Sequence, residues 1–158
     1  MKHDDFTIDI RDATTSDAAA ILEIQKLAFH GQGILYNDFT LPPLLQTLEE
    51  LVLDFKKHLF LKAMDEGRVV GSIRGRAERE TCFISRLIVH PDYQNKGIGK
   101  KLMHAVENKF GKALRYELST GHKSEKNLAL YAKLGYREYE RKPQSAKVML
   151  ICLEKWKP

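Results

Sequence analysis

The chain has 158 residues, of which 43% are hydrophobic and 30% are charged, a composition that is typical of one soluble globular domain and excludes extended disorder. Its formal net charge of +5 comes from Lys and Arg residues that are spread along the chain, so an anionic small ligand accounts for the charge as well as nucleic acid does. No run of 18 apolar residues occurs, and residues 1–5 are unlike a signal peptide, so we expect a cytoplasmic protein with no membrane segment and a single domain over residues 1–158.

The first third of the chain predicts a strand and a helix. Residues 7–10 alternate between polar and apolar side chains, which is typical of a strand, and residues 14–17 offer several helix N-cap candidates. The following segment carries apolar residues at helical spacing. We expect this helix to end at Gly31 and Gly33, before a loop that runs through residues 37–43.

A second helix and a hairpin follow. Thr47 and Glu50 match a capping box, which predicts a helix that ends near His58. Residues 59–64 and 69–76 are strand-like and are separated by an acidic residue pair and a glycine, as in a tight hairpin.

A strand, helix and strand unit comes next. Residues 81–89 are strongly β-prone, residues 99–110 return to helical periodicity, and residues 113–118 resume strand character. Such a crossover can place its two strands parallel, with a ligand site at the carboxyl end of the first. A last helix is expected between Ser124 as N-cap and Gly135 as its end.

Two further strands complete the prediction, near residues 136–141 and 147–153. The two cysteines, Cys82 and Cys152, stand in apolar runs, and their spacing matches no metal or redox motif. We therefore expect buried, reduced thiols and no metal site.

The turn before the third helix carries the most informative residues. Gly97 and Gly99 let the main chain approach a ligand closely, and the unpaired N–H groups at a helix start point toward an anion. A Walker loop needs four residues between its glycines, and a Rossmann fingerprint needs Gly or Ala where Leu102 stands. A pyrophosphate site of another kind is therefore indicated.

These residues resemble the GNAT superfamily of acyl-CoA-dependent N-acyltransferases. Gln94, Gly97 and Gly99 match its signature of Gln or Arg, two residues, Gly, one residue, and Gly or Ala. The resemblance extends upstream to residues 86–91 and downstream to residues 127–136. It implies a mixed α/β fold, with a mostly antiparallel sheet of six or seven strands, about four flanking helices and central parallel strands that are splayed around the cofactor.

The resemblance also implies a reaction and its site. The activity would be transfer of an acetyl group from acetyl-CoA to a primary amine, by direct attack in a ternary complex. Tyr131 matches a tyrosine that often protonates the departing thiolate, and the acceptor pocket would include residues 31–39. The cofactor would contact Leu87, Ile88, Val89, Gln94, Asn95, Lys96, Gly97, Ile98, Gly99, Lys100 and Asn127.

The general base is the least defined part of this site. Many family members carry a glutamate on the strand before the turn, but residues 81–90 contain no acidic residue. Glu117 is our candidate in its place, acting directly or through water, with a surface ion pair as the alternative. Ser85, His122 and Glu78 are weaker candidates. We assign no catalytic role to His90, which is expected to cap the strand end, or to His104.

Alternative functions remain open at this point. The turn would contact only the part of the cofactor that all acyl-CoAs share, so transfer of a larger acyl group such as succinyl is an alternative to transfer of acetyl. The missing strand glutamate also allows a non-catalytic module that binds coenzyme A. No nucleic-acid recognition motif is visible, so we expect no nucleic-acid partner. A homodimer is possible by analogy with the family.

Overall fold

The computed structural model describes residues 7–158, so the expectation for residues 1–5 lies outside it. Within this range the chain forms one seven-stranded sheet with the order β1-β2-β3-β4-β5-β7-β6. The strands are β1 (Asp9–Asp12), β2 (Leu59–Asp65), β3 (Arg68–Glu78), β4 (Thr81–Val89), β5 (Arg115–Gly121), β6 (Arg137–Pro143) and β7 (Met149–Trp156).

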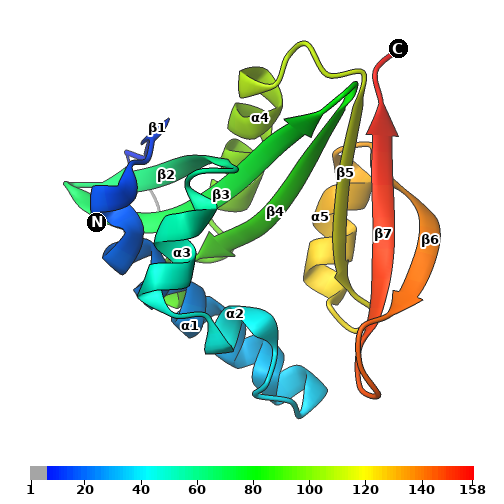
Figure 1. Ribbon diagram of the computed structural model, residues 1–158, viewed down its shortest axis with the longest axis horizontal. Helices are drawn as coiled ribbons and strands as arrows, with labels where there is room; N and C mark the ends of the chain where they lie inside the picture. The colour runs from blue at the N-terminus through cyan, green and yellow to red at the C-terminus, as the bar shows by residue number, and fades with distance from the viewer. Residues whose placement is uncertain (1–6) are drawn as a thin grey trace.

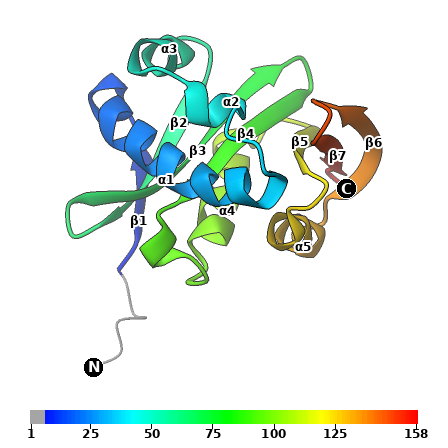
Figure 2. The ribbon, with the colours of Figure 1, turned by 90° about the horizontal axis from the view of Figure 1, so that it is seen from below.

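Helices cover both faces of the sheet. They are the α-helices α1 (Ala18–Tyr36), α2 (Pro42–Leu45), α3 (Leu48–Asp54), α4 (Ile98–Lys109) and α5 (Glu125–Lys133), with short 3-10 helices at Thr15–Asp17 and Pro91–Tyr93. Figure 2 shows α1, α2 and α3 on one face and α4 and α5 on the other. The expected mixed α/β architecture is confirmed, with five helices in place of about four.

The sheet opens between its two central strands. β4 and β5 run parallel, whereas the other neighbouring strands are antiparallel. The pairing of β4 with β5 covers only Thr81 to Phe83 and Arg115 to Glu117. Beyond these residues the strands separate toward their carboxyl ends, as Figure 1 shows. The expected splay is therefore present, and it leaves one edge of β4 without a neighbouring strand.

Apolar side chains on the two faces of the sheet hold the helices in place. On one face, Ile21 and Ile24 of α1 pack with Phe60 and Ile88 of the sheet. The larger cluster on the other face includes Leu102 of α4, together with side chains of β2, β3, β5 and α5. Because each fully buried aliphatic side chain contributes roughly 1.5–3 kcal/mol, these clusters fix both layers against the central strands.

An extra residue in β4 changes which way its side chains point. Ser72 of β3 is opposite Ile88 and Arg74 is opposite Ser85, so two steps along β3 face three along β4. Arg86 lies in this bulge with φ of 53°, a left-handed conformation that is uncommon for residues other than glycine and costs of order 1–3 kcal/mol. Bulges re-aim side chains and are frequent near functional sites.

Three boundaries differ from the sequence prediction. α1 continues past Gly31 and Gly33 to Tyr36. The glycine at position 33 serves a close contact inside the helix and does not end it, since a Cβ there would lie 2.6 Å from the ring of Phe39. The short helix α2 occupies part of the expected loop, and it begins with two prolines, which are favourable in a first turn. The capping box at Thr47 is confirmed, but α3 ends at Asp54, before His58.

The sequence predicted buried, reduced cysteines and no membrane-spanning segment. Cys82 and Cys152 are free and buried, as expected. In the part of the chain from residue 7 onward, no helix combines the length and the apolar character needed to cross a bilayer.

Candidate active site

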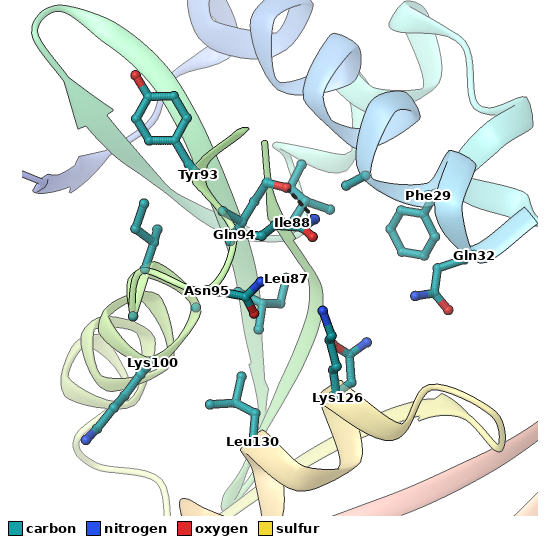
Figure 3. Close-up of a pocket in the computed structure, with 16 residues that line it drawn as sticks. Phe29, Gln32, Leu87, Ile88, Tyr93, Gln94, Asn95, Lys100, Lys126 and Leu130 are labelled. Atoms are coloured by element: carbon teal, nitrogen blue, oxygen red, sulfur yellow. Dashed lines mark hydrogen bonds between the residues drawn. The ribbon is translucent and has the colours of Figure 1, made fainter. Parts of the chain in front are cut away.

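A cavity of about 320 Å³ lies where β4 and β5 separate. Figure 3 shows the lining side chains converging from α1, from the end of β4 and the turn after it, and from α5. They are Ala28, Phe29 and Gln32 of α1, Leu87, Ile88 and Val89 of β4, Tyr93, Gln94, Asn95, Gly97, Ile98, Gly99 and Lys100 around the turn, and Lys126, Asn127 and Leu130 of α5. The structure thus brings together every residue expected to contact a cofactor except Lys96.

The turn between β4 and α4 is shaped to present main-chain N–H groups. Asn95 and Gly97 both have positive φ, at 63° and 81°, and Gly97 is the N-cap residue of α4. Gln94 closes the turn by donating a hydrogen bond from Nε2 to the carbonyl of Val89 at 3.2 Å. Successive N–H groups in such a turn form an anion-binding concavity, and the α4 dipole adds roughly 0.3–1 kcal/mol for a negative charge.

His90 caps the 3-10 helix that follows β4, and not the strand end as the sequence suggested. Its Nδ1 accepts a hydrogen bond from the N–H of Asp92 at 3.1 Å, at the start of the 3-10 helix Pro91–Tyr93. The hydroxyl of Tyr93 donates to Asp65 at 2.8 Å and ties this helix to the β2–β3 hairpin. These contacts hold the entry to the turn in one conformation.

Basic side chains stand on both sides of the cavity mouth. Figure 3 shows the ammonium group of Lys126 directed into the space between Asn95 and Gln32, whereas Lys100 points outward along α4. Charge-assisted hydrogen bonds from such groups to phosphate oxygens are roughly twice as strong as neutral ones. The cavity therefore has an anion-binding end.

The wall formed by α1 was predicted only in part: Gln32 belongs to the segment 31–39 expected at the acceptor pocket, whereas Ala28 and Phe29 were not expected there. Ser124 donates from Oγ to Oε1 of Gln32 at 2.7 Å, so the Gln32 amide nitrogen is left to face the cavity, as Figure 3 shows. Phe29 lies beside it and supplies an apolar surface. Gln25, Gln32 and Tyr36 share one helix face at spacings of seven and four, which is a polar interruption of an apolar stripe that could have been noticed.

Comparison with known proteins now decides the family. Residues 19–136 match the model described as the acetyltransferase (GNAT) family. The chain belongs to the GNAT acetyltransferase family. The resemblance inferred from the turn and from residues 127–136 is thereby confirmed, and so, at the level of the family, is the acyltransferase class.

Individual relatives of this GNAT chain are distant. The UPF0157 protein YqkA of Bacillus subtilis (strain 168) is 25% identical over 123 residues, which are 78% of this chain and 35% of that protein. The chain therefore spans about a third of the length of this curated relative. The activity has to be argued from the site itself.

Solved structures share the fold over nearly the whole chain. The PaiA N-acetyltransferase from Thermoplasma acidophilum, in complex with coenzyme A, superposes with a TM-score of 0.75 at 19% identity, covering 96% of this chain and 99% of that one. YncA from Salmonella typhimurium, with its cofactor acetyl-CoA, also gives a TM-score of 0.75, at 20% identity, covering 95% and 94%. At these identities the likeness establishes the GNAT fold.

Asn127 and Tyr131 lie one turn apart on α5 but face different surroundings. Asn127 lines the cavity, and its Nδ2 donates weakly to Oγ1 of Thr120 at 3.4 Å. Tyr131 is 6% exposed and packs in the core, with its ring 6.1 Å from that of Tyr136. It is not among the residues that line the cavity. Burial raises the pKa of the Tyr131 hydroxyl, so the phenol stays protonated.

Glu117 lies away from the cavity. It sits in the paired part of β5, opposite Phe83, and forms an ion pair of 2.9 Å with Arg115. Arg115 also contacts Glu154 at 2.7 Å. The sequence left open an exposed ion pair as the alternative to a base, whereas the side chains of this pair are largely buried. The structure does not bring Glu117 to the cavity.

The weaker base candidates are also placed elsewhere. Glu78 is at the end of β3, in an exposed ion pair with Arg76. The hydroxyl of Ser85 accepts a hydrogen bond from Nε of Arg74 at 2.9 Å. Neither residue lines the cavity.

His122 lies in the connection between β5 and α5, where its ring contacts the main chain at the start of β7. Its Nδ1 lies 3.0 Å from the N–H of Met149 and accepts a hydrogen bond from it. A neutral ring in this arrangement carries its proton on Nε2. His122 is not among the residues that line the cavity, so the structure does not bring this candidate to it.

Proposed function

We propose that this chain transfers the acetyl group of acetyl-CoA to a primary amine by direct attack in a ternary complex. The observation that carries the proposal is the cavity at the separated ends of β4 and β5, closed at one side by the anion-binding turn. The distant solved structures named above hold coenzyme A and acetyl-CoA, which supports the choice of co-substrate.

The pyrophosphate of acetyl-CoA fits the turn from Gln94 to Gly99. Each main-chain N–H that bonds a charged phosphate oxygen contributes roughly 1.5–3 kcal/mol net. Lys126, whose ammonium group is directed into the cavity, would add positive charge beside it. A few such contacts support micromolar binding, since 1 µM corresponds to about −8.2 kcal/mol.

The arm of the cofactor fits the open edge of β4. The N–H of His90 donates to the carbonyl of Val70 in β3 at 2.8 Å. The main-chain N–H and C=O groups of successive strand residues point to alternate sides of the strand. Those of Val89 and Leu87 therefore point away from β3, toward the gap in which β5 no longer pairs with β4. The carbonyl of Val89 already accepts a hydrogen bond from Gln94. An extended amide chain can pair with the remaining groups, as an added strand would.

Acetyl-CoA supplies a thioester whose carbonyl carbon accepts the amine: a C–N bond forms, the C–S bond breaks, and one proton passes from nitrogen to sulfur. The amine must first be neutral, and for an amine with a pKa of about 10.4 this costs roughly 4.6 kcal/mol at pH 7. Of the lining residues in the described chain, none carries a carboxylate or an imidazole. We therefore propose water as the carrier of this proton.

Tyr131 is proposed as the proton donor to the departing sulfur. It lies one turn after Asn127, which lines the cavity, and its phenol is kept protonated by burial, which raises its pKa. A donor to a leaving group acts mainly in the transition state, so its effect belongs in kcat more than in cofactor affinity.

A non-catalytic coenzyme A-binding module is the second candidate, favoured by the absence of carboxylates and imidazoles among the lining residues. Transfer of isotopically labelled acetyl from acetyl-CoA to amines, with the products identified by mass, separates the two. Label in an amide product supports transfer, and competition with succinyl-CoA tests the acyl group. Binding of acetyl-CoA without any labelled product favours the module.

A further inference from the structure

A cluster of charged and polar side chains lies under α2 and α3, beside the bulge in β4. Arg74 of β3 is 10% exposed at its side chain and donates to Oδ2 of Asp54 at 2.6 Å. Its Nε also donates to Ser85. Gln46 donates to the same Asp54 oxygen at 2.7 Å. The single carboxylate of the cluster is therefore committed to Arg74.

A second guanidinium, that of Arg86, enters the same cluster from the bulge. Its Nη1 donates to Oε1 of Gln46 at 3.1 Å, a neutral amide oxygen. Within residues 7–158, Arg86 forms no ion pair. Its pKa is lowered to about 10, first by burial and then by the charge of Arg74.

The charges of this cluster do not balance. It contains two guanidinium groups, those of Arg74 and Arg86, and one carboxylate, that of Asp54. Burial lowers the pKa of the neighbouring His58, which favours its neutral ring and leaves this imbalance unchanged. A half-buried cation without a counter-charge is costly, and an arriving anion offsets that cost. A guanidinium presents its donors in a planar fork that matches a carboxylate.

Arg86 lies in β4 beside the cavity, although it is not one of the residues that line it. It directly precedes Leu87, which lines the cavity. If the pyrophosphate lies on the turn, the arm of acetyl-CoA runs back along Val89 and Leu87, and its thioester arrives beside Arg86. The positive φ of Arg86 directs the side chain to the α2–α3 side of β4, opposite the side on which Leu87 packs.

We propose that the acceptor is an amine that also bears a carboxylate, as an α-amino acid does, and that Arg86 binds this carboxylate. The inference rests on the proposed acetyltransferase function. Arg86 acts here in substrate recognition, so its effect belongs in the KM of the acid and not in that of acetyl-CoA.

The test compares common α-amino acids with their α-carboxamides, which keep the amine and lose the negative charge. Acetyl-CoA is the donor, and kcat/KM is measured for each pair with the wild-type chain. The same pairs are measured with Arg86→Gln, with Arg86→Lys, and with Arg137→Gln, a control that removes an exposed arginine from β6. Thermal unfolding and acetyl-CoA affinity of each variant check the fold and the cofactor site.

We expect an amino acid to exceed its carboxamide at least tenfold in kcat/KM. Arg86→Gln should abolish this ratio by raising the KM of the acid, Arg86→Lys should keep part of it, and Arg137→Gln should keep all of it. Equal use of acid and carboxamide, or a preference that survives in Arg86→Gln, overturns the inference. Turnover of only carboxylate-free amines overturns it while the acetyltransferase function stands. If no amine is acetylated although acetyl-CoA binds, the function itself is wrong and the inference falls with it.

Discussion

The hydroxyl of Tyr36, at the end of α1, lies 2.9 Å from the hydroxyl of Ser124, the N-cap residue of α5. It also accepts a hydrogen bond from the N–H of Lys123 at 2.8 Å. Because Ser124 donates onward to Gln32, Tyr36 is the donor in its bond to Ser124. This chain of hydrogen bonds joins the α1 wall of the cavity to the α5 wall across the gap between β4 and β5.

We predict that Tyr36→Phe loosens both walls. The substitution leaves the Lys123 N–H and the buried Ser124 hydroxyl without this partner, which costs about 1–3 kcal/mol of unfolding free energy. Acetyl-CoA affinity should fall severalfold, as measured by calorimetry. Tyr116→Phe is the control, because it removes two bonds to carbonyls near the end of α4, away from the cavity. Equal affinity loss in both variants would contradict a specific role for the Tyr36 link.

Gly97→Ala should weaken acetyl-CoA binding without a steric clash. No atom lies within 4 Å of a Cβ added at Gly97, so the effect comes from its φ of 81°, which costs an alanine about 1–2 kcal/mol. Gly67→Ala is matched, since Gly67 has φ of 77° and equally open surroundings in the β2–β3 hairpin. Both variants should lose similar stability in urea unfolding, and only Gly97→Ala should lose at least tenfold in acetyl-CoA affinity.

Tyr131→Phe should lower kcat at least tenfold and leave the dissociation constant of acetyl-CoA within twofold. General acid catalysis typically contributes 10²–10⁴-fold, which sets the scale. Tyr136→Phe is the control, because that hydroxyl packs in the same core and donates to Glu107 at 2.7 Å. It should lose stability and keep its turnover. Unchanged kcat in Tyr131→Phe would remove this residue from the mechanism.

Stability should fall in alkaline solution. Burial raises the pKa of the Cys82 thiol from 9.0 to about 12, and burial also raises the pKa of Tyr131 and Tyr136. A raised native pKa means that the unfolded chain releases a proton first, so stability is complete below about pH 9 and is lost as pH rises toward 12. Each such group contributes a slope of about 1.4 kcal/mol per pH unit.

Urea unfolding between pH 8 and pH 11 checks this dependence. Cys82→Ala should be less stable at pH 8, because it leaves a small cavity, but its stability should decline less steeply between pH 9 and 11. A variant whose curve runs parallel to that of the wild-type chain would show that Cys82 does not carry this titration.

Much of the fold could be predicted because its signals are local. The alternation in β2, β3 and β4 and the capping box at Thr47 depend on neighbouring residues only. The predicted end of α1 at Gly33 was wrong, because this glycine is required by a tertiary contact. It makes room for the ring of Phe39 and does not end the helix. The prediction therefore placed Gln32 and Tyr36 in a loop, whereas they belong to the last turns of α1.

The candidate site likewise has a part that local sequence predicts and a part that depends on tertiary contacts. The turn from Gln94 to Gly99 carries its geometry in its own sequence, and all of its predicted residues except Lys96 line the cavity. The role of Glu117 depends on its partner Arg115 and on the depth of the β4–β5 pairing, which no local pattern encodes. The charge cluster of Asp54, Arg74 and Arg86 likewise exists only when α3, β3 and the bulge of β4 meet.

The most direct test of the central claim is the initial rate at which free coenzyme A appears from acetyl-CoA, measured with and without each amine of a panel. We predict release that depends on an acceptor, well above the no-acceptor rate, with the acetylated amine formed in equal amount. Acetyl-CoA binding by calorimetry combined with no acceptor-dependent release from any amine would contradict the assignment as an N-acetyltransferase.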